Sequence, residues 1–504
     1  MVFTPQLQPE NETRLLWKPR FFYTSIKFRE REIRLETERQ NTKRELDMLH
    51  GTLWDKIPLF ALPVAATSIL EQMYNVTDLA VLGHFAGKGS TAAIAAVGAN
   101  SPVIALIVTF FVGIALGCTV RIANAIGRQD EETVHRTVHT AISLALLGGI
   151  LVALLGETLA GPLLQLLEVP EEVLPQAELY LRIYLAGLPV IVLYNFEGAV
   201  FRSVGDTRTP LRALVLATIL NGLLDLLFIL GPGWMVGGVA LGTVLANGFS
   251  ALLLLWKLCR TPSVIRLQLR KLSMDGAALR GILQVGLPAG LQSAVFSLAN
   301  LVIQAAVNSL GTVALAASSA SLNIEIIVYD VLNAFSQACT TFVGQNFGAG
   351  QLRRCQKILK ICLGEDILAV GFCIVATLGL GNRVLELFNR DPQVMALAHT
   401  RLTIVFSGYG FSLLYEVISG YLRGFGISAL PAFLTFLGVC GTRLFWIWAI
   451  FPRYPSFQTV MRVYPLSLII TALLLGSLLL VLRPARRYEE KNWTMFDDKK
   501  KEVQ

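Results

Sequence analysis

Carboxylates lie inside two apolar segments of this chain, where their charge is costly. The stretch MYNVTDLAVLG carries Asp78 among valine, alanine and leucine, and the stretch NGLLD carries Asn221 and Asp225 in similar surroundings. A charge at the centre of a bilayer costs roughly 2.5–3.5 kcal/mol on insertion scales, so such a residue indicates a functional site. Asn221 and Asp225 are four residues apart and therefore share one face of a helix.

A further polar side chain, Thr243, lies at a similar depth in another apolar segment. At 1.5 Å per residue, Asp78, Asp225 and Thr243 each lie roughly 9–12 Å from the outer end of a helix, so they could form one oxygen-rich site. Two carboxylates there cannot both stay ionised cheaply, so the pair takes up a proton, or a sodium ion binds among the oxygens. The alternative is that these groups only hold neighbouring helices together. We favour the ion site because two carboxylates repel each other unless a cation joins them.

The elements that position these residues are long apolar helices. Of the 504 residues, 54% are hydrophobic and only 15% are charged, whereas soluble domains carry about 25% charged residues. Solidly apolar runs of roughly 20 residues predict membrane-spanning helices. We expect an all-α integral membrane protein with twelve spans, near residues 57–83, 92–119, 134–160, 176–201, 210–230, 236–257, 281–308, 313–340, 356–380, 396–421, 429–451 and 463–482.

Basic residues gather on one side of these spans. The connection 257–280 is rich in lysine and arginine, whereas the opposite side carries the acidic stretch EVPEEVLPQAE. Because basic loops stay in the cytoplasm, we expect both termini to be cytoplasmic, in a multi-pass protein of the cell membrane. The net charge of +8 then belongs to loops that face the lipid bilayer, which argues against a nucleic-acid partner.

The first fifty residues are polar and contain no apolar signal-peptide core. Met48, just before the first span, offers an alternative start. The seven cysteines form no CxxC pair and are interpreted as small buried side chains, without a zinc site or disulfides.

The two halves of the chain repeat each other. The stretch LYNFEGAVFRSVGDTRTP, at 193–210, resembles LYEVISGYLRGFGISALP, at 414–431. Six spans per half give the halves the same direction, so a pseudo-two-fold axis along the membrane normal relates them. The expected parts are an N-terminal extension 1–50, a six-helix half 51–257, a basic linker 258–280, a six-helix half 281–482 and a charged tail 483–504.

Other polar residues inside the spans could line a cleft between the halves and meet a cationic substrate, or could hydrogen-bond neighbouring helices. These candidates are Glu71, Asn195, Glu197, Asn300, Gln304, Glu325, Tyr415 and Glu416.

In their order and topology, four motifs resemble the multidrug and toxic compound extrusion (MATE) family, and are most similar to its DinF-like bacterial branch. They are YNVTDLAVLG, RSVGDTRTPL, NGLLDLLFI and GQNFGAG, and the resemblance covers about residues 50–482. It implies secondary antiport, in which a proton or sodium ion enters and an organic compound leaves. The implied cation site comprises Asp78, Asn221, Asp225 and Thr243, with Tyr74 beside the aspartate.

The NorM-like branch instead carries acidic ligands on spans seven and ten. The matching positions here are Phe296 and Ser412, which argues against a cation site of that type in the C-terminal half.

The sequence therefore predicts a monomeric antiporter for organic, cationic or amphipathic compounds, with no cofactor beyond the coupling ion. A flippase for lipid-linked precursors is the alternative. A basic central cavity would favour it, whereas the intramembrane charges here are mostly acidic. A membrane-embedded enzyme is disfavoured because the spans contain no HExxH, paired-aspartate or Ser/His motif.

Overall fold

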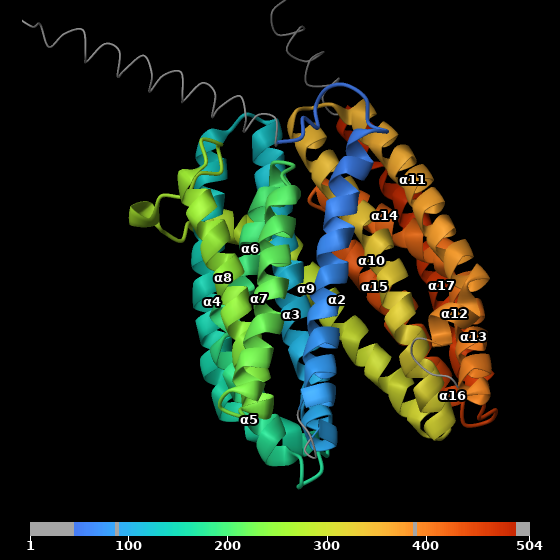
Figure 1. Ribbon diagram of the computed structural model, residues 1–504. Coiled ribbons are helices and arrows are strands. Elements are labelled where there is room, and N and C mark those ends of the chain that lie inside the picture. Colours follow the sequence, from blue (N-terminus) through green and yellow to red (C-terminus); the bar gives the residue numbers. More distant parts are fainter. Residues whose placement is uncertain (1–44, 86–89, 387–390, 490–504) are drawn as a thin grey trace, which may run out of the picture. The chain divides into compact units, whose positions relative to one another are not determined.

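The described residues of the computed structural model, 45–85, 90–386 and 391–489, form helices and no strand (Figure 1). Ten of these helices are long and apolar enough to cross a membrane, and two bent helix pairs bring the total to twelve. The predicted all-α membrane fold is therefore confirmed. Residues 1–44 of the predicted extension and residues 490–504 of the predicted tail lie outside the described residues.

The helices described in the N-terminal half make six spans, because α5 and α6 together form one. Their bounds are α2 Lys56–Phe85, α3 Ser90–Gly127, α4 Glu131–Leu166, α5 Leu174–Ala186, α6 Leu188–Ser203, α7 Arg208–Leu230 and α8 Met235–Arg260. Figure 1 shows α4, α6, α7 and α8 side by side, in agreement with their packing contacts.

The C-terminal half repeats this order after the short 3₁₀ helix η2 Leu269–Lys271. Its elements are α9 Gly276–Asn308, α10 Thr312–Gly348, α11 Leu352–Gly379, α12 Gly381–Glu386, α13 Pro392–Ser407, α14 Tyr409–Gly424, α15 Ala429–Thr435, the π-helix η3 Phe436–Gly441, α16 Thr442–Ala449 and α17 Phe457–Leu482. The end of the helices that carries residues 261–275 is called the linker end, and the opposite end is called the far end.

Matching bends confirm the repeat in three dimensions. The chain bends by 49° between α5 and α6, at Gly187, and by 46° between α13 and α14, at Gly408. A Cβ on Gly187 would collide with Val244 of α8, and a Cβ on Gly408 would lie 2.7 Å from Pro465 of α17. The glycine at each bend therefore lets the last helix of its half pack closely against it.

The two halves meet through paired glycines at the linker end. A Cβ on Gly127 of α3 would collide with the carbonyl of Gln345 of α10, and a Cβ on Gly348 of α10 would collide with the carbonyl of Asn124 of α3. The two contacts exchange under the pseudo-two-fold repeat, as in an interface between identical partners. Close backbone approach of this kind is typical of small residues in membrane helices.

Helix α2 contributes to both halves. Near the linker end, its buried apolar residues between Ile57 and Ala65 belong to the C-terminal core, where the Phe60 ring lies 5.9 Å from the Phe342 ring of α10. Further along, Tyr74 belongs to an N-terminal core cluster. A change at the far end of α2 can therefore reach the interface between the halves.

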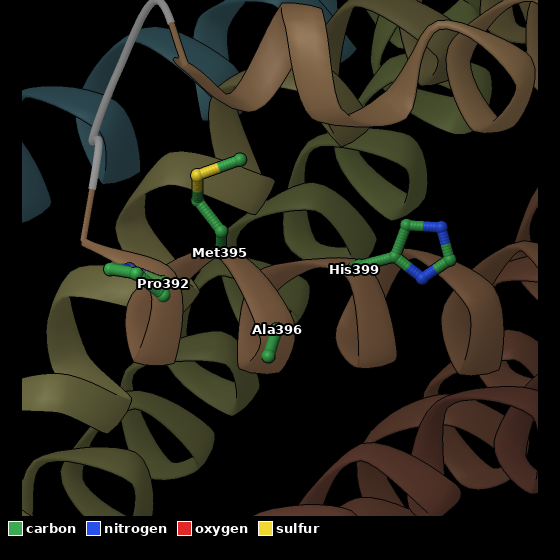
Figure 2. A pocket seen from close by; sticks show the side chains of 4 residues that line it. All are labelled: Pro392, Met395, Ala396 and His399. Atoms are coloured by element: carbon green, nitrogen blue, oxygen red, sulfur yellow. The ribbon is translucent and has the colours of Figure 1, made fainter.

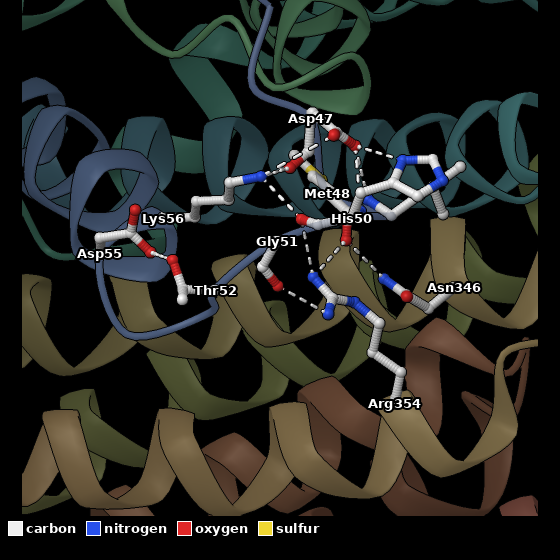
Figure 3. Close-up of polar contacts among 10 residues, drawn as sticks. Asp47, Met48, His50, Gly51, Thr52, Asp55, Lys56, Asn346 and Arg354 are labelled. Atoms are coloured by element: carbon white, nitrogen blue, oxygen red, sulfur yellow. Dashed lines mark hydrogen bonds and ion pairs between the residues drawn. The ribbon is translucent and has the colours of Figure 1, made fainter.

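A segment before α2, residues 45–55, lies against the linker end and is called the strap (Figure 3). Arg354 Nη1 of α11 donates to the carbonyl of Gly51 at 2.9 Å, and Asn346 Nδ2 of α10 donates to the carbonyl of Met48 at 3.0 Å. These side chains fasten the strap to the C-terminal half.

The strap also touches the N-terminal half. Gly205, in the turn between α6 and α7, has φ +87°, a left-handed value that favours glycine. A Cβ there would lie 2.9 Å from Cβ of Leu46 and 3.0 Å from the methyl group of Met48. The strap therefore spans both halves where they meet.

Candidate functional site

Three helices bring Asp78, Asn221, Asp225 and Thr243 together. Thr243 Oγ1 of α8 donates to Asp78 Oδ2 of α2 at 3.0 Å. Asn221 Nδ2 of α7 lies 3.4 Å from Asp225 Oδ1 and 3.4 Å from Thr243 Oγ1. Residues from three separate predicted spans thus form one connected group.

This group, called the carboxylate site, is closed to solvent. Asp78 is 1% exposed and Asp225 is 0% exposed. Among the described residues, no lysine or arginine forms an ion pair with either carboxylate. Burying two anions without a counter-charge costs several kcal/mol each, so the site favours the uptake of positive charge.

The site also has unused acceptors. Asp78 Oδ1, Asp225 Oδ2 and Asn221 Oδ1 are buried, and each lacks a hydrogen-bond partner within the described residues. Thr243 and Asn221 connect the two carboxyl groups. Carboxylate, amide and hydroxyl oxygens are also the ligands that hard cations prefer. The arrangement can hold a proton or a small cation.

Close packing of α7 and α8 fixes this geometry. A Cβ on Gly242 of α8 would collide with Asp225 Oδ1. The glycine thus lets the aspartate lie directly against the neighbouring helix. Tyr74, on α2, is buried on the same side of its helix as Asp78, and its hydroxyl has no partner in the described part of the chain.

The residues predicted to line a cleft have different surroundings in the N-terminal half. Glu71 is exposed, and the charge of Arg202 of α6 acts on it. Asn195 is half-buried and donates to Ile191 of its own helix at 2.9 Å. Glu197 is fully buried, and both of its oxygens lack a partner among the described residues. Of these three residues, Glu71 therefore has the most accessible side chain.

In the C-terminal half, two of the predicted cleft carboxylates are bound by arginines. Glu325 of α10 receives two bonds from Arg401 of α13, at 2.6 and 2.9 Å. Glu416 of α14 lies 3.7 Å from Arg423 and accepts from the hydroxyl of Tyr329 at 3.2 Å. These carboxylates are therefore already neutralised within the protein.

The neutral candidates of this half are also engaged, and Tyr415 is buried beside Glu416 and Ser412. Gln304 Nε2 donates to Asn308 of its own helix at 2.9 Å. Asn300 Oδ1 of α9 accepts from Arg443 Nη1 of α16 at 2.7 Å. The polar groups that were expected to face a cleft are therefore largely bonded inside the C-terminal half.

Sequence reasoning passed over several buried charged residues of this half, among them Arg401, Arg443 and Asp366. Arg401 is 1% exposed and Arg443 is 2% exposed. Asp366 of α11 is fully buried, and both of its oxygens lack a partner among the described residues. The sequence could have indicated these residues, because each is a charged residue inside an apolar run. The same criterion singled out Asp78.

A shallow hollow lies at the start of α13, toward the far end (Figure 2). It is lined by Pro392, Met395, Ala396 and His399, none of which was predicted as a site residue. Its lining contains no carboxylate, so it offers no counter-charge for a cation.

Comparisons with known proteins agree with this architecture. The sequence profile of the family described as MatE matches residues 63–227 and 288–448. A probable multidrug resistance protein, YoeA of Bacillus subtilis, is 25% identical over 400 residues, which cover 78% of this chain and 86% of that protein. The probable multidrug resistance protein NorM of Thermotoga maritima is 27% identical over 396 residues, which cover 76% of this chain and 82% of that protein.

A solved structure of a MOP superfamily transporter from Pyrococcus furiosus superposes with a TM-score of 0.79 at 21% identity. The superposition covers 86% of this chain and 96% of that chain. At this identity the likeness establishes the fold alone.

Proposed function

The chain belongs to the MatE family and is a multi-pass multidrug efflux transporter, and from this premise we propose that it is an antiporter coupled to protons or sodium ions. The coupling ion binds at the carboxylate site, and an organic compound leaves in exchange. The observation that carries this proposal is the pair of buried aspartates without a basic partner among the described residues.

The proposed coupling runs through α2. Without its ion, Asp78 faces Asp225 with two uncompensated charges in a low-dielectric site. With the ion bound, the three helices can close tightly around it. Since α2 packs into the C-terminal core near the linker end, a shift at Asp78 changes the packing between Phe60 and Phe342. Ion occupancy thereby biases which end of the transporter is open.

The substrate is proposed to be an organic cation or amphipathic compound. The exposed carboxylate of Glu71 supports this, because it is the accessible acidic side chain among the predicted cleft residues of the N-terminal half. The linker end and both termini are proposed to lie in the cytoplasm, because basic loops stay on that side of the membrane. The protein is further proposed to act as a monomer in the cell membrane.

Proton release from purified protein in a weakly buffered solution tests the ion site directly. Adding sodium, or the substrate probe rhodamine B methyl ester, should displace protons from the wild type, and a pH-sensitive dye measures the release. Asp225→Asn should abolish the release. Glu178→Gln is the matched control, because Glu178 is paired with Arg182 on α5. Equal release from wild type and Asp225→Asn would refute the proposed site.

A further inference from the structure

Arg443 is a buried positive charge without an acidic partner among the described residues. Its guanidinium donates to two neutral oxygens, Asn300 Oδ1 at 2.7 Å and Ser467 Oγ at 3.3 Å. The rings of Phe296 and Tyr464 lie 5.1 and 4.5 Å from it. Within residues 45–85, 90–386 and 391–489, no carboxylate forms an ion pair with it.

Arg401 shows how the same half neutralises a buried arginine. It is held by both oxygens of Glu325 and also donates to Ser318. Arg443 has five N–H donors, and within the described part of the chain two acceptors bond to them. The cation–π contacts with Phe296 and Tyr464 offset only part of the free energy that burying the ion costs. Arg443 can therefore bind an anion, whereas Arg401 is already paired with the carboxylate of Glu325.

The pseudo-two-fold repeat relates Arg443 to the carboxylate site. Pro210 of α7 and Pro431 of α15 close the two matching stretches of the repeat and occupy the same place near the start of their helices. The π-helix η3 then adds one residue before α16 begins, so Asn221 corresponds to Arg443 rather than to Thr442.

The neighbours of Arg443 follow the same relation. Asn300 lies on α9, the counterpart of α2, and Ser467 and Tyr464 lie on α17, the counterpart of α8. Tyr464 follows Thr243 by the same interval that separates Pro431 from Pro210. Two carboxylates lie where α2, α7 and α8 meet, and a guanidinium lies at the corresponding place in the C-terminal half, where α9, α16 and α17 meet.

We propose that Arg443 forms a second binding site, which takes the carboxylate or phosphate group of an organic substrate. The inference rests on the proposed export function and names the substrate class: amphipathic compounds that carry an acidic group beside an aromatic ring. The acidic group displaces the Asn300 amide oxygen and bonds two guanidinium N–H groups side by side. Asn300 and Phe296 are half-buried on α9, and they form the accessible side of the site.

Two dyes that differ only at the acidic group test this site. Rhodamine B has a free carboxylate, and its methyl ester does not. Binding of each to the purified full-length protein is followed by fluorescence anisotropy. The wild type should bind the free acid about tenfold more tightly than the ester, the gain of one charge-assisted pair. Arg443→Gln should remove that preference, and Arg443→Lys should keep part of it.

Asn300→Asp is the variant that separates loss of the binding site from loss of the fold. The new carboxylate would neutralise Arg443 internally, so it should stabilise the fold while removing the preference for the free acid. Arg453→Gln, at an exposed arginine outside the helices, is the control and should keep the preference.

A wild-type preference for the ester, or a preference for the acid that survives both Arg443→Gln and Asn300→Asp, would overturn the site. In that case ion-driven export of the ester, lost in Asp78→Asn, would still uphold the exporter. If neither dye is bound or exported, both proposals fail.

Discussion

Thr243 donates a 3.0 Å hydrogen bond to Asp78, although 165 residues separate them in the chain. The bond joins the first and last spans of the N-terminal half. It leaves Asp78 Oδ1 without a partner among the described residues. The side chains of the carboxylate site are therefore held together, while one oxygen of Asp78 stays available to an ion. This is the condition for reversible binding of an ion.

Gly242→Ala should disable the carboxylate site without unfolding the protein. Its new Cβ would collide with Asp225 Oδ1 and displace this carboxylate from its place beside Asn221. Gly222→Ala on α7 is the matched control, because its nearest neighbour, Thr77 Cγ2, would lie at an ordinary 3.6 Å. Sodium- or substrate-induced proton release is expected to fall in the first variant and persist in the second. Equal release from the two would show that close packing at Gly242 is not required.

Glu325→Gln should destabilise the protein far more than Asp78→Asn does. Removing Glu325 leaves Arg401 buried without its counter-charge, a loss of about 3–5 kcal/mol. Neutralising Asp78 removes a repulsion instead. Thermal unfolding in detergent measures the difference, and Glu325→Gln combined with Arg401→Met should recover much of the loss. A larger drop for Asp78→Asn would contradict the division between ion-binding and structural carboxylates.

Arg354→Gln should loosen the strap. The substitution removes donors to the carbonyls of Gly51 and His50. Backbone amides of residues 46–52 are expected to exchange hydrogen faster, while those of α10 stay protected. Arg353→Gln is the neighbouring control, because Arg353 is exposed and pairs with Glu489. Unchanged exchange in Arg354→Gln would mean that other contacts hold the strap.

Gly127→Ala should keep the halves from meeting at the linker end, because its Cβ would collide with the Gln345 carbonyl. Spin labels at the exposed positions Arg208 and Arg353, one in each half, should report a longer and broader distance. Gly98→Ala, which meets nothing within 4 Å, is the control. A distance unchanged by Gly127→Ala would show that the interface tolerates the side chain.

The sequence predicted the spans and the carboxylate group because both follow from local rules. Apolar length fixes a span, and a carboxylate inside one stands out, as Asp78 did. The partners of Glu325 and Asn300 could not be read in this way, because Arg401 and Arg443 come from helices far along the chain. Applying the rule for buried charge to arginine as well as to carboxylates would have singled out both. The bends at Gly187 and Gly408 depend on tertiary packing, which no local pattern contains.

Ion-driven transport in proteoliposomes tests the central claim most directly. Uptake of rhodamine B methyl ester would be followed under an imposed pH gradient and, separately, a sodium gradient, for wild type, Asp78→Asn and Asp225→Asn. We expect one of the gradients to drive accumulation by the wild type, and both variants to lose it while remaining folded, because each removes one half of the ion site. Gradient-driven accumulation by both variants at the wild-type rate would contradict the account.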